Sequence, residues 1–456
     1  MEIYLLPVTD AQSAGKFIIY RPVHGLAFIG NRSMAELCLA LAGKAPLPTG
    51  GVPQEVLDFL NALGFFDQDV PPAPPDPAFQ PVMATLLLTN QCQLRCIYCY
   101  AAAGEFPPQQ LSAELGCAAI DYVHDTAQRL GRTSYEISFH GGGEPVMAWE
   151  VMTACTEHAR LKPVKAILTL TSNGMWNARQ TEWILANLDG VGISMDGGLA
   201  TQNRQRPTAG GWRSSTRVMR SLAKLDQHNF HYGIRMTALA PWQSLPEDVR
   251  FICENTGCKG MQVEPAFNAG RGRHGQPGDQ DAAAFVEAFM QALEIANQAG
   301  RVLHYSGSRL GTVTTTFCNA PYQALVVNPS GQVVACFEIA TDSHALLQLS
   351  TIGHITHGQV SIDEAARQAL HALIAGQRAA CRDCFCYWSC AGDCYTRSYD
   401  AQAGVFRRGV RCDINRLLME KLLLRAIEQG GGVWRSPTRY SAPLSMAAFE
   451  NLEPQA

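Results

Sequence analysis

The sequence predicts an α/β fold, a partial (β/α)6 barrel of parallel strands with a smaller unit at either end. Between residues 82 and 299, apolar strand patterns alternate six times with helical patterns, which is typical of a parallel sheet covered by helices. Six units are fewer than the eight of a closed barrel, so we expect the barrel to be open on one side. A proline-rich stretch precedes it, and a cysteine-rich stretch follows it.

Composition and charge are those of an ordinary globular protein. The 456 residues are 47% hydrophobic and 17% charged, and the formal net charge of -4 provides no basic stripe for nucleic acid. The first residues lack the basic segment and apolar run of a signal peptide, and no apolar run is long enough to cross a membrane. We therefore expect a cytoplasmic protein. In that reducing compartment, 16 cysteines indicate metal or cluster binding rather than disulfides.

Residues 1–66 predict a small separate unit. A hairpin pattern covers residues 16–30, Ser33 is expected to cap a first helix, and residues 53–66 predict a second helix. Six prolines between residues 67 and 81 keep the chain extended, which indicates a semi-rigid linker.

The barrel is predicted for residues 82–305, and its first strand is expected from Val82 to Thr89. The other expected strands are 135–140, 165–171, 190–195, 231–239 and 260–263. The helices that alternate with them are expected at 112–131, 149–160, 178–187, 212–228, 245–255 and 279–299. Because the carboxyl ends of parallel barrel strands share one face, we expect the chemistry there.

Three cysteines directly follow the first strand. Cys92, Cys96 and Cys99 are separated by three and then two residues, and Tyr100 comes next. Three thiolates in a tight loop can hold three irons of a cubane cluster and leave the fourth iron open to a substrate or cofactor. The alternative is a zinc loop completed by a distant fourth ligand.

This motif resembles the cluster loop of the radical S-adenosylmethionine (SAM) enzymes, and the resemblance extends from residue 82 to about residue 415. It implies a [4Fe-4S] cluster at Cys92, Cys96 and Cys99 that binds SAM. It also implies an external one-electron reductant of the flavodoxin or ferredoxin type. In this family the reduced cluster splits SAM into methionine and a 5'-deoxyadenosyl radical, which removes hydrogen from an unactivated carbon.

Polar residues follow several of the predicted strands, and the resemblance implies that they contact SAM. Glu144 would meet the methionine ammonium, and Ser194 and Asp196 the ribose. Either Arg204 or Arg206 would pair with the carboxylate. The full set is Tyr98, Gly142, Gly143, Glu144, Ser172, Asn173, Ser194, Asp196, Arg204, Arg206 and Val263, the last beside the adenine. Taken singly, each segment could instead be a structural turn.

Residues 306–428 carry seven cysteines whose spacing resembles the SPASM extension of radical SAM enzymes, which holds two auxiliary iron-sulfur clusters. The resemblance implies that the outer cluster is ligated by Cys381, Cys384, Cys390 and Cys412, and the inner one by Cys318, Cys336 and Cys394. The region around Ala324 offers no further cysteine, so the inner cluster would be open or completed by another group. A pair of zinc ribbons is the alternative. Residues 429–456 form a tail without an assigned role.

Together these features predict a radical SAM enzyme with three [4Fe-4S] clusters that oxidatively modifies a ribosomally synthesised precursor peptide. The expected product is a side-chain cross-link of the C–C cyclophane or thioether type. Auxiliary clusters would accept the electron released on bond formation, and Glu338 is a candidate for accepting the proton. Residues 1–66 resemble winged-helix-like leader-peptide recognition domains, which bind a peptide by strand addition. A structural cap on the barrel is the alternative for this unit.

Three other functions stay open at this point. A peptide epimerase would need a hydrogen donor, and Cys386, which is surplus to the motif, could serve; it could equally be a ligand, a redox thiol or a buried bystander. A formylglycine-type, sulfatase-maturing enzyme would carry an aspartate after the cysteine that corresponds to Cys336, but Phe337 is found there. A zinc- or peptide-binding protein without catalysis is the third. Neither nucleic acid nor membrane is an expected partner.

Overall fold

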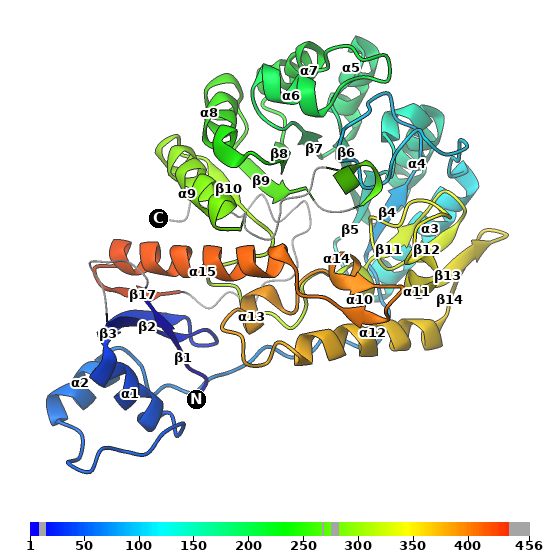
Figure 1. The fold of residues 1–456 in the computed structure, drawn as a ribbon. Coiled ribbons are helices and arrows are strands. Elements are labelled where there is room, and N and C mark those ends of the chain that lie inside the picture. Colours follow the sequence, from blue (N-terminus) through cyan, green and yellow to red (C-terminus); the bar gives the residue numbers. More distant parts are fainter. Residues whose placement is uncertain (9–14, 267–268, 275–281, 437–456) are drawn as a thin grey trace.

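The computed structural model describes residues 1–8, 15–266, 269–274 and 282–436 (Figure 1). Six parallel strands lie side by side in sequence order and form its centre. They are β4 (Met83–Leu87), β5 (Ser134–His140), β6 (Lys165–Ser172), β7 (Gly190–Ser194), β8 (Tyr232–Ala238) and β9 (Gly260–Pro265). The helices between and after them are α3 (Ala113–Arg129), α4 (Trp149–Arg160), α5 (Ala178–Asn187), α6 (Leu199–Gln205), α7 (Ser215–Gln227), α8 (Leu245–Asn255) and α9 (Ala282–Gln298).

The sheet continues at both edges beyond these six strands. β10 (Val302–His304) lies parallel to β9, and β11 (Leu325–Val327) lies parallel to β4. From β11 the order runs through the antiparallel strands β12 (Gln332–Val334), β13 (Thr351–Thr356) and β14 (Gln359–Ile362). Among the described residues β10 and β14 do not pair with each other, so the barrel is open, and the predicted fold class is confirmed.

Alternation along the strands separates an apolar outer face from a more polar inner face. In β8, Ile234 and Met236 are buried, whereas Arg235 and Thr237 between them are half-buried. In β9, Val263 is buried and Glu264 is half-buried. Successive strand residues point to opposite faces, so the polar set faces the inside of the arc. The helices cover the apolar face, as Figure 1 shows.

Several predicted helix starts are shifted. The N-terminal helix is capped by Asn31, whose side chain accepts a hydrogen bond from Met34 N, so the expected Ser33 cap was wrong. The helix predicted from residue 212 begins at Ser215, because the backbone at Trp212 instead closes a turn with Thr208. The predicted start at residue 279 lies outside the described residues, within which α9 begins at Ala282.

The N-terminal unit has the predicted hairpin and two helices. These are β1 (Tyr4–Pro7), β2 (Lys16–Arg21), β3 (Leu26–Asn31), α1 (Arg32–Leu41) and α2 (Gln54–Ala62). Its four-stranded sheet has the order β1-β2-β3-β17, and β17 (Val433–Arg435) comes from the segment that the sequence analysis left as an unassigned tail. The C-terminal segment is therefore a structural part of this unit.

The cysteine-rich third lies between the N-terminal unit and the barrel in Figure 1. Its remaining elements are α10 (Ala320–Gln323), α11 (Leu347–Ser350), α12 (Glu364–Ala379), α13 (Tyr387–Cys390), α14 (Tyr395–Ser398), β15 (Tyr399–Asp400), β16 (Val405–Phe406) and α15 (Val410–Gln429). Within the described part of the chain, none of the helices is both long and apolar enough to span a bilayer.

Candidate active site

The three-cysteine loop lies at the carboxyl end of β4. Cys96 is buried, and Cys92 and Cys99 are half-buried. The Cys92 sulfur accepts hydrogen bonds from Leu94 N at 3.4 Å and from Asn173 Nδ2 at 3.6 Å, which is the environment of a thiolate ligand. Burial raises the pKa of Cys92 to about 12 and that of Cys96 to about 11, so thiolates here need a bound cation to stabilise them. The donor set fits an iron-sulfur cluster.

A zinc ion and an iron-sulfur cluster hold their cysteines differently. Zinc holds each sulfur at about 2.3 Å, so its ligands converge on one point, whereas a cubane cluster holds its cysteines farther apart. Across the described ranges, no three His, Cys, Asp or Glu side chains converge in the zinc-like way.

Two arginines fix the backbone of the loop. Arg95 donates from Nη1 to the Cys92 carbonyl at 2.6 Å, and Arg271 donates from Nε to the Cys96 carbonyl at 2.9 Å. Arg271 also pairs with Glu105 at 2.6 Å. These contacts were not anticipated from the sequence, because Arg271 lies 175 residues after Cys96. They orient the loop and place positive charge beside the thiolates.

The glycine segment after β5 packs directly against the loop. Gly143 N donates to Thr89 O and Glu144 N to Gln91 O, both at 2.8 Å. A Cβ atom on Gly143 would lie 2.1 Å from the Gln91 carbonyl oxygen, and one on Gly142 would lie 2.3 Å from Ala340 Cβ. Only glycine fits such an approach.

Glu144 follows the glycine segment, and its side chain has hydrogen-bond partners at the end of β6. Its side chain is buried and turned toward β6, where it accepts hydrogen bonds from Ser172 Oγ at 2.6 Å and from Asn173 N at 2.8 Å. Burial raises the pKa of Glu144 to about 7, although these donors partly offset the effect. Glu144 therefore joins the ends of β5 and β6 and holds Asn173 against Cys92.

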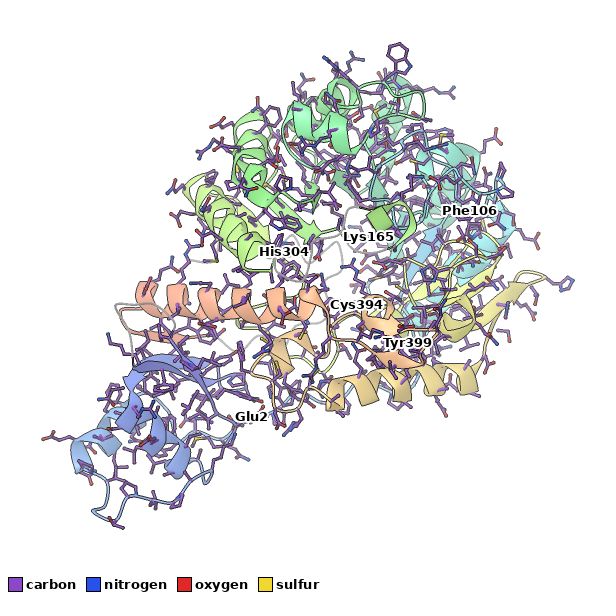
Figure 2. All side chains as sticks on the ribbon, in the orientation of Figure 1. Glu2, Phe106, Lys165, His304, Cys394 and Tyr399 are labelled. Atoms are coloured by element: carbon purple, nitrogen blue, oxygen red, sulfur yellow. The ribbon has the colours of Figure 1, made fainter. Side chains whose placement is uncertain are left out.

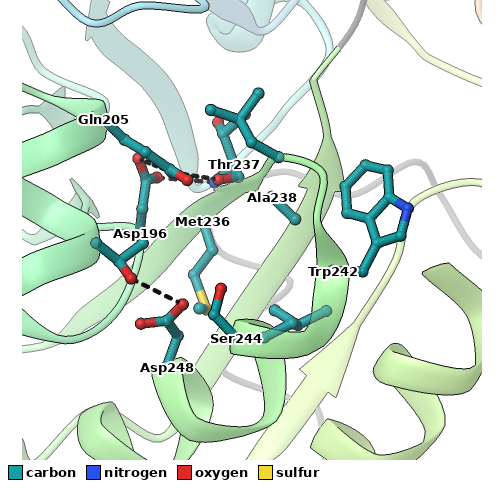
Figure 3. Close-up of a pocket in the computed structure, with 11 residues that line it drawn as sticks. Asp196, Gln205, Met236, Thr237, Ala238, Trp242, Ser244 and Asp248 are labelled. Carbon is teal, nitrogen blue, oxygen red and sulfur yellow. Dashed lines mark hydrogen bonds between the residues drawn. The ribbon is translucent and has the colours of Figure 1, made fainter. Parts of the chain in front are cut away.

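Asp196, after β7, is the centre of a second buried cluster. It accepts hydrogen bonds from Tyr98 Oη at 2.5 Å, Gln205 Nε2 at 2.9 Å and Thr237 N at 2.9 Å, and it pairs with Arg206 at 2.8 Å. A small pocket lies beside it, and Figure 3 shows Asp196, Gln205 and Thr237 on one side and Trp242 on the other. Asp196 thus links the loop, α6 and β8.

The structure distinguishes the two candidate arginines. Arg206 is buried, and its guanidinium lies 5.2 Å from the centre of the Tyr98 ring, within the cluster loop. Arg204 is exposed. Arg206 is therefore the one of the pair that lies against the cluster loop.

We expect Arg206→Ala to lower anaerobic 5'-deoxyadenosine formation by roughly tenfold or more, because it leaves buried Asp196 without its ion pair. Arg204→Ala is the matched control and should retain the wild-type rate. Chromatography of the reaction products, with iron content measured for each variant, compares them. A wild-type rate in Arg206→Ala would contradict this assignment.

Ser194 and Val263, two further predicted cofactor contacts, lie on opposite faces of the sheet. Ser194 ends β7 half-buried on the inner side, as expected for a cofactor contact. The Val263 side chain is fully buried in the outer core, so only its backbone could reach an adenine. Its neighbour Glu264 faces inward instead.

Glu264 belongs to a buried ion-pair network that the sequence analysis missed. It pairs with Arg411 at 2.9 Å and with Arg397 at 3.4 Å. Arg397 also pairs with Glu338 at 2.9 Å, and Arg411 pairs with Asp393 at 2.9 Å. Burial raises the pKa of Glu264, but Arg411 and Arg397 outweigh it and lower the value to about 2. The network joins β9 of the barrel to the cysteine-rich third.

The seven C-terminal cysteines gather in the two predicted groups. In the inner group, Thr396 Oγ1 lies 3.0 Å from the Cys394 sulfur and 3.7 Å from that of Cys336. After burial, the charges of Glu338, Cys394 and Cys318 raise the pKa of Cys336. Figure 2 places Cys394 between the barrel and α12.

In the outer group, too, neighbouring cysteines affect one another's pKa values. Burial, and then the charges of Cys384 and Cys381, raise the pKa of Cys412 to about 11. Burial and then the charge of Asp393 raise the pKa of Cys390, and Cys384 adds a smaller contribution. A side-chain donor again reaches a sulfur, since Asn415 Nδ2 lies 3.4 Å from the sulfur of Cys390.

The two candidate catalytic residues lie apart. Glu338 is at the inner group, with its amide 3.5 Å from the Cys336 sulfur. Cys386 is buried in an apolar cluster with Ile18, Tyr20 and Met419, between the N-terminal sheet and α15. Its sulfur lies 3.8 Å from the Asn415 carbonyl. Cys386 therefore does not face the inside of the barrel.

Sequence comparison shows distant relatives. No protein-family profile matches the chain. It is 26% identical over 287 residues to the sporulation killing factor maturation protein SkfB of Bacillus subtilis, covering 60% of this chain and 64% of SkfB. It is 24% identical over 249 residues to pre-heme d1 synthase of Dinoroseobacter shibae, covering 52% of this chain and 58% of the synthase. The chain spans less than two thirds of the length of these relatives.

Solved structures share the fold. The enzyme anSMEcpe with bound AdoMet superimposes with a TM-score of 0.60 at 17% identity, over 76% of this chain and 99% of that one. SuiB of Streptococcus suis bound to S-adenosylmethionine superimposes with a TM-score of 0.51 at 15% identity, over 86% of this chain and 98% of SuiB. SuiB has also been solved bound to precursor peptide SuiA.

Proposed function

We propose that this chain, whose fold and cysteine motifs are those of the radical SAM enzymes with a SPASM extension, oxidatively modifies a ribosomally synthesised precursor peptide. The observation that carries the proposal is the three-cysteine loop at the end of β4, with two further cysteine groups beside the open barrel. When bound, a reduced cluster and SAM would supply the radical that removes hydrogen from the substrate.

Two comparisons support a peptide as the substrate. SkfB is named as a maturation protein for a killing factor, and SuiB has been solved with a precursor peptide. We further propose that the unit of residues 1–66 recognises the leader part of the peptide by strand addition.

The cofactors proposed are SAM and three [4Fe-4S] clusters, with a flavodoxin- or ferredoxin-type reductant. Cys92, Cys96 and Cys99 would hold the first cluster, while Asn173, Arg95 and Arg271 position the loop. The outer cysteine group offers four ligands and the inner group three, with the Thr396 hydroxyl nearest to the inner sulfurs. An inner cluster of that kind can accept an electron from a substrate radical.

Glu338 is the proposed proton acceptor. Arg397 at 2.9 Å and Thr396 at 3.4 Å fix its carboxylate beside the inner cysteine group. When a carbon radical bonds to an intact side chain, one electron and one proton must leave. A carboxylate next to the proposed electron acceptor supports a cross-linking reaction of the C–C or thioether type.

The alternatives are less well supported. An epimerase needs a hydrogen donor at the substrate, and Cys386 is buried in an apolar cluster instead. A formylglycine-type oxidation would use an aspartate after Cys336, whereas the Phe337 ring found there lies 6.1 Å from that of His140, the last residue of β5.

Mass spectrometry of the precursor peptide after an anaerobic reaction in heavy water tests the proposal. We expect the peptide to lose two hydrogen atoms for each cross-link, with one SAM cleaved per bond. The precursor would come from a reading frame next to this one. An unchanged mass apart from one carbon-bound deuterium would establish epimerisation instead, and a mass change confined to a single cysteine or serine would establish formylglycine formation.

A further inference from the structure

One edge of the N-terminal sheet is occupied by the chain's own C-terminal segment. β17 pairs antiparallel with β3, with Val433 opposite Phe28 and Trp434 opposite Ala27. The pairing continues in the hydrogen bond from Ser436 N to Gly25 O at 2.8 Å. Figure 1 shows this strand, from the red end of the chain, against the blue N-terminal strands. The edge of β3 therefore accepts an added strand.

The contacts of β17 show which side chains this edge accommodates. Val433 packs on the apolar cluster that contains Phe28 and Leu60. The Trp434 ring lies 6.3 Å from that of Tyr20, on the opposite face. Arg435 donates from Nη2 to the Ala62 carbonyl at 2.7 Å. The edge thus fits an aliphatic, an aromatic and a basic residue in succession.

The other edge of the sheet is a poor site for strand addition. β1 ends at Pro7, which has no N–H to donate. The Ile3 carbonyl, just before the strand, already accepts a hydrogen bond from Lys44 Nζ at 3.1 Å. Proline on an edge strand commonly prevents pairing with another chain, and here the Lys44 side chain also occupies a carbonyl next to this strand. A peptide that adds to this sheet is therefore directed to the β3 side.

β17 is built so that it can leave this edge. It is only three residues long, and it is joined to α15 by Gly430, Gly431 and Gly432. Gly431 and Gly432 have φ values of 67° and 103°, in the region that favours glycine. Rotation at these residues can release β17 while α15 stays packed.

We propose that the β3 edge is the docking edge for the leader of the precursor peptide, and that β17 occupies this edge until the leader replaces it. The partner is an extended peptide segment with an aliphatic, an aromatic and a basic residue in succession, bound by strand addition. This inference rests on the proposed function, because it assumes that a precursor peptide is the substrate.

The test uses Trp434→Pro in the full, cluster-loaded chain. Ser436 N–H donates to Gly25 O, just before β3, and Trp434 lies two residues earlier in the antiparallel ladder, so the Trp434 N–H also points at β3. Proline at position 434 removes this N–H donor. The probe is a fluorescently labelled synthetic peptide with the sequence of residues 429–436. We expect it to bind the variant roughly tenfold or more tightly than the wild type, because the tethered strand no longer competes. Gln359→Pro, at the start of edge strand β14, is the control and should bind like the wild type.

A second arm connects this edge to the substrate. The precursor peptide should displace the probe from Trp434→Pro, and in the wild type it should speed hydrogen exchange at residues 430–436. Equal or weaker probe binding by Trp434→Pro, or slower exchange at residues 430–436, would overturn the inference. A precursor that is modified without displacing the probe would also overturn the inference about the β3 edge. In that case the proposed function would still stand. Probe binding without any modification of the precursor would instead overturn the proposed function.

Discussion

Replacing Cys92, Cys96 and Cys99 together by alanine should abolish 5'-deoxyadenosine formation while the two proposed auxiliary clusters remain. The reason is structural: the three sulfurs lie in one loop at the end of β4, apart from the two C-terminal groups. Anaerobic iron analysis should give about twelve irons for the wild type and about eight for the variant, since each cluster holds four.

The matched control replaces two cysteines outside the three groups, Cys117 on α3 and Cys253 on α8, by serine. This variant should keep the wild-type iron content and rate. Undiminished 5'-deoxyadenosine formation by the triple variant would remove the basis for the radical SAM assignment. Loss of all iron would show instead that the three sites are not independent.

Glu264→Leu should lower the free energy of unfolding by about 1.5–3 kcal/mol, the usual contribution of hydrogen bonds to charged groups, because Arg397 keeps Glu338 and Arg411 keeps Asp393 as partners. The Glu264 side chain is only 16% exposed, and its removal leaves Arg397 and Arg411 facing each other without the shared carboxylate. Glu247→Leu removes a carboxylate that is 71% exposed and pairs with Arg250, so its effect should stay below about 1 kcal/mol. Anaerobic denaturant unfolding of both variants measures the difference.

The stability that Glu264 contributes should depend on pH with a defined sign. The folded-state pKa of Glu264 is about 2, below the value of about 4.3 for an unperturbed glutamate. A lowered carboxyl pKa stabilises the fold above the unfolded pKa, and this contribution is lost as the pH falls toward the folded pKa. The stability difference between wild type and Glu264→Leu should therefore be constant near neutral pH and should narrow below about pH 4.3. A gap that widens on acidification would contradict the ion-pair account.

The sequence predicted those features that depend on residues close together in the chain. The strand and helix alternation fixed the fold class, because consecutive parallel strands usually become neighbours in the sheet. The spacing of Cys92, Cys96 and Cys99 predicted their loop, since all three lie within one short turn after β4.

Side-chain direction and long-range pairing could not be predicted in the same way. Val263 and Glu264 are adjacent, and only the register of β9 decides which of them faces inward. Arg204 and Arg206 could be distinguished only after the end of α6 was placed against Asp196. The hydrogen bonds from Ser172 and Asn173 to Glu144 depend on the placement of β6 beside β5, which the sequence does not show. β17 has three residues after three glycines, too short for any strand pattern.

The position of β17 also bears on how the chain folds during synthesis. The strands β1, β2 and β3 leave the ribosome first, whereas the strand that completes their sheet is made only after the barrel and the cysteine-rich third. Throughout that interval the edge of β3 has no partner from its own chain, which is the condition under which exposed edges pair with other molecules. A nascent chain would therefore present this edge to a neighbouring peptide before the finished protein covers it.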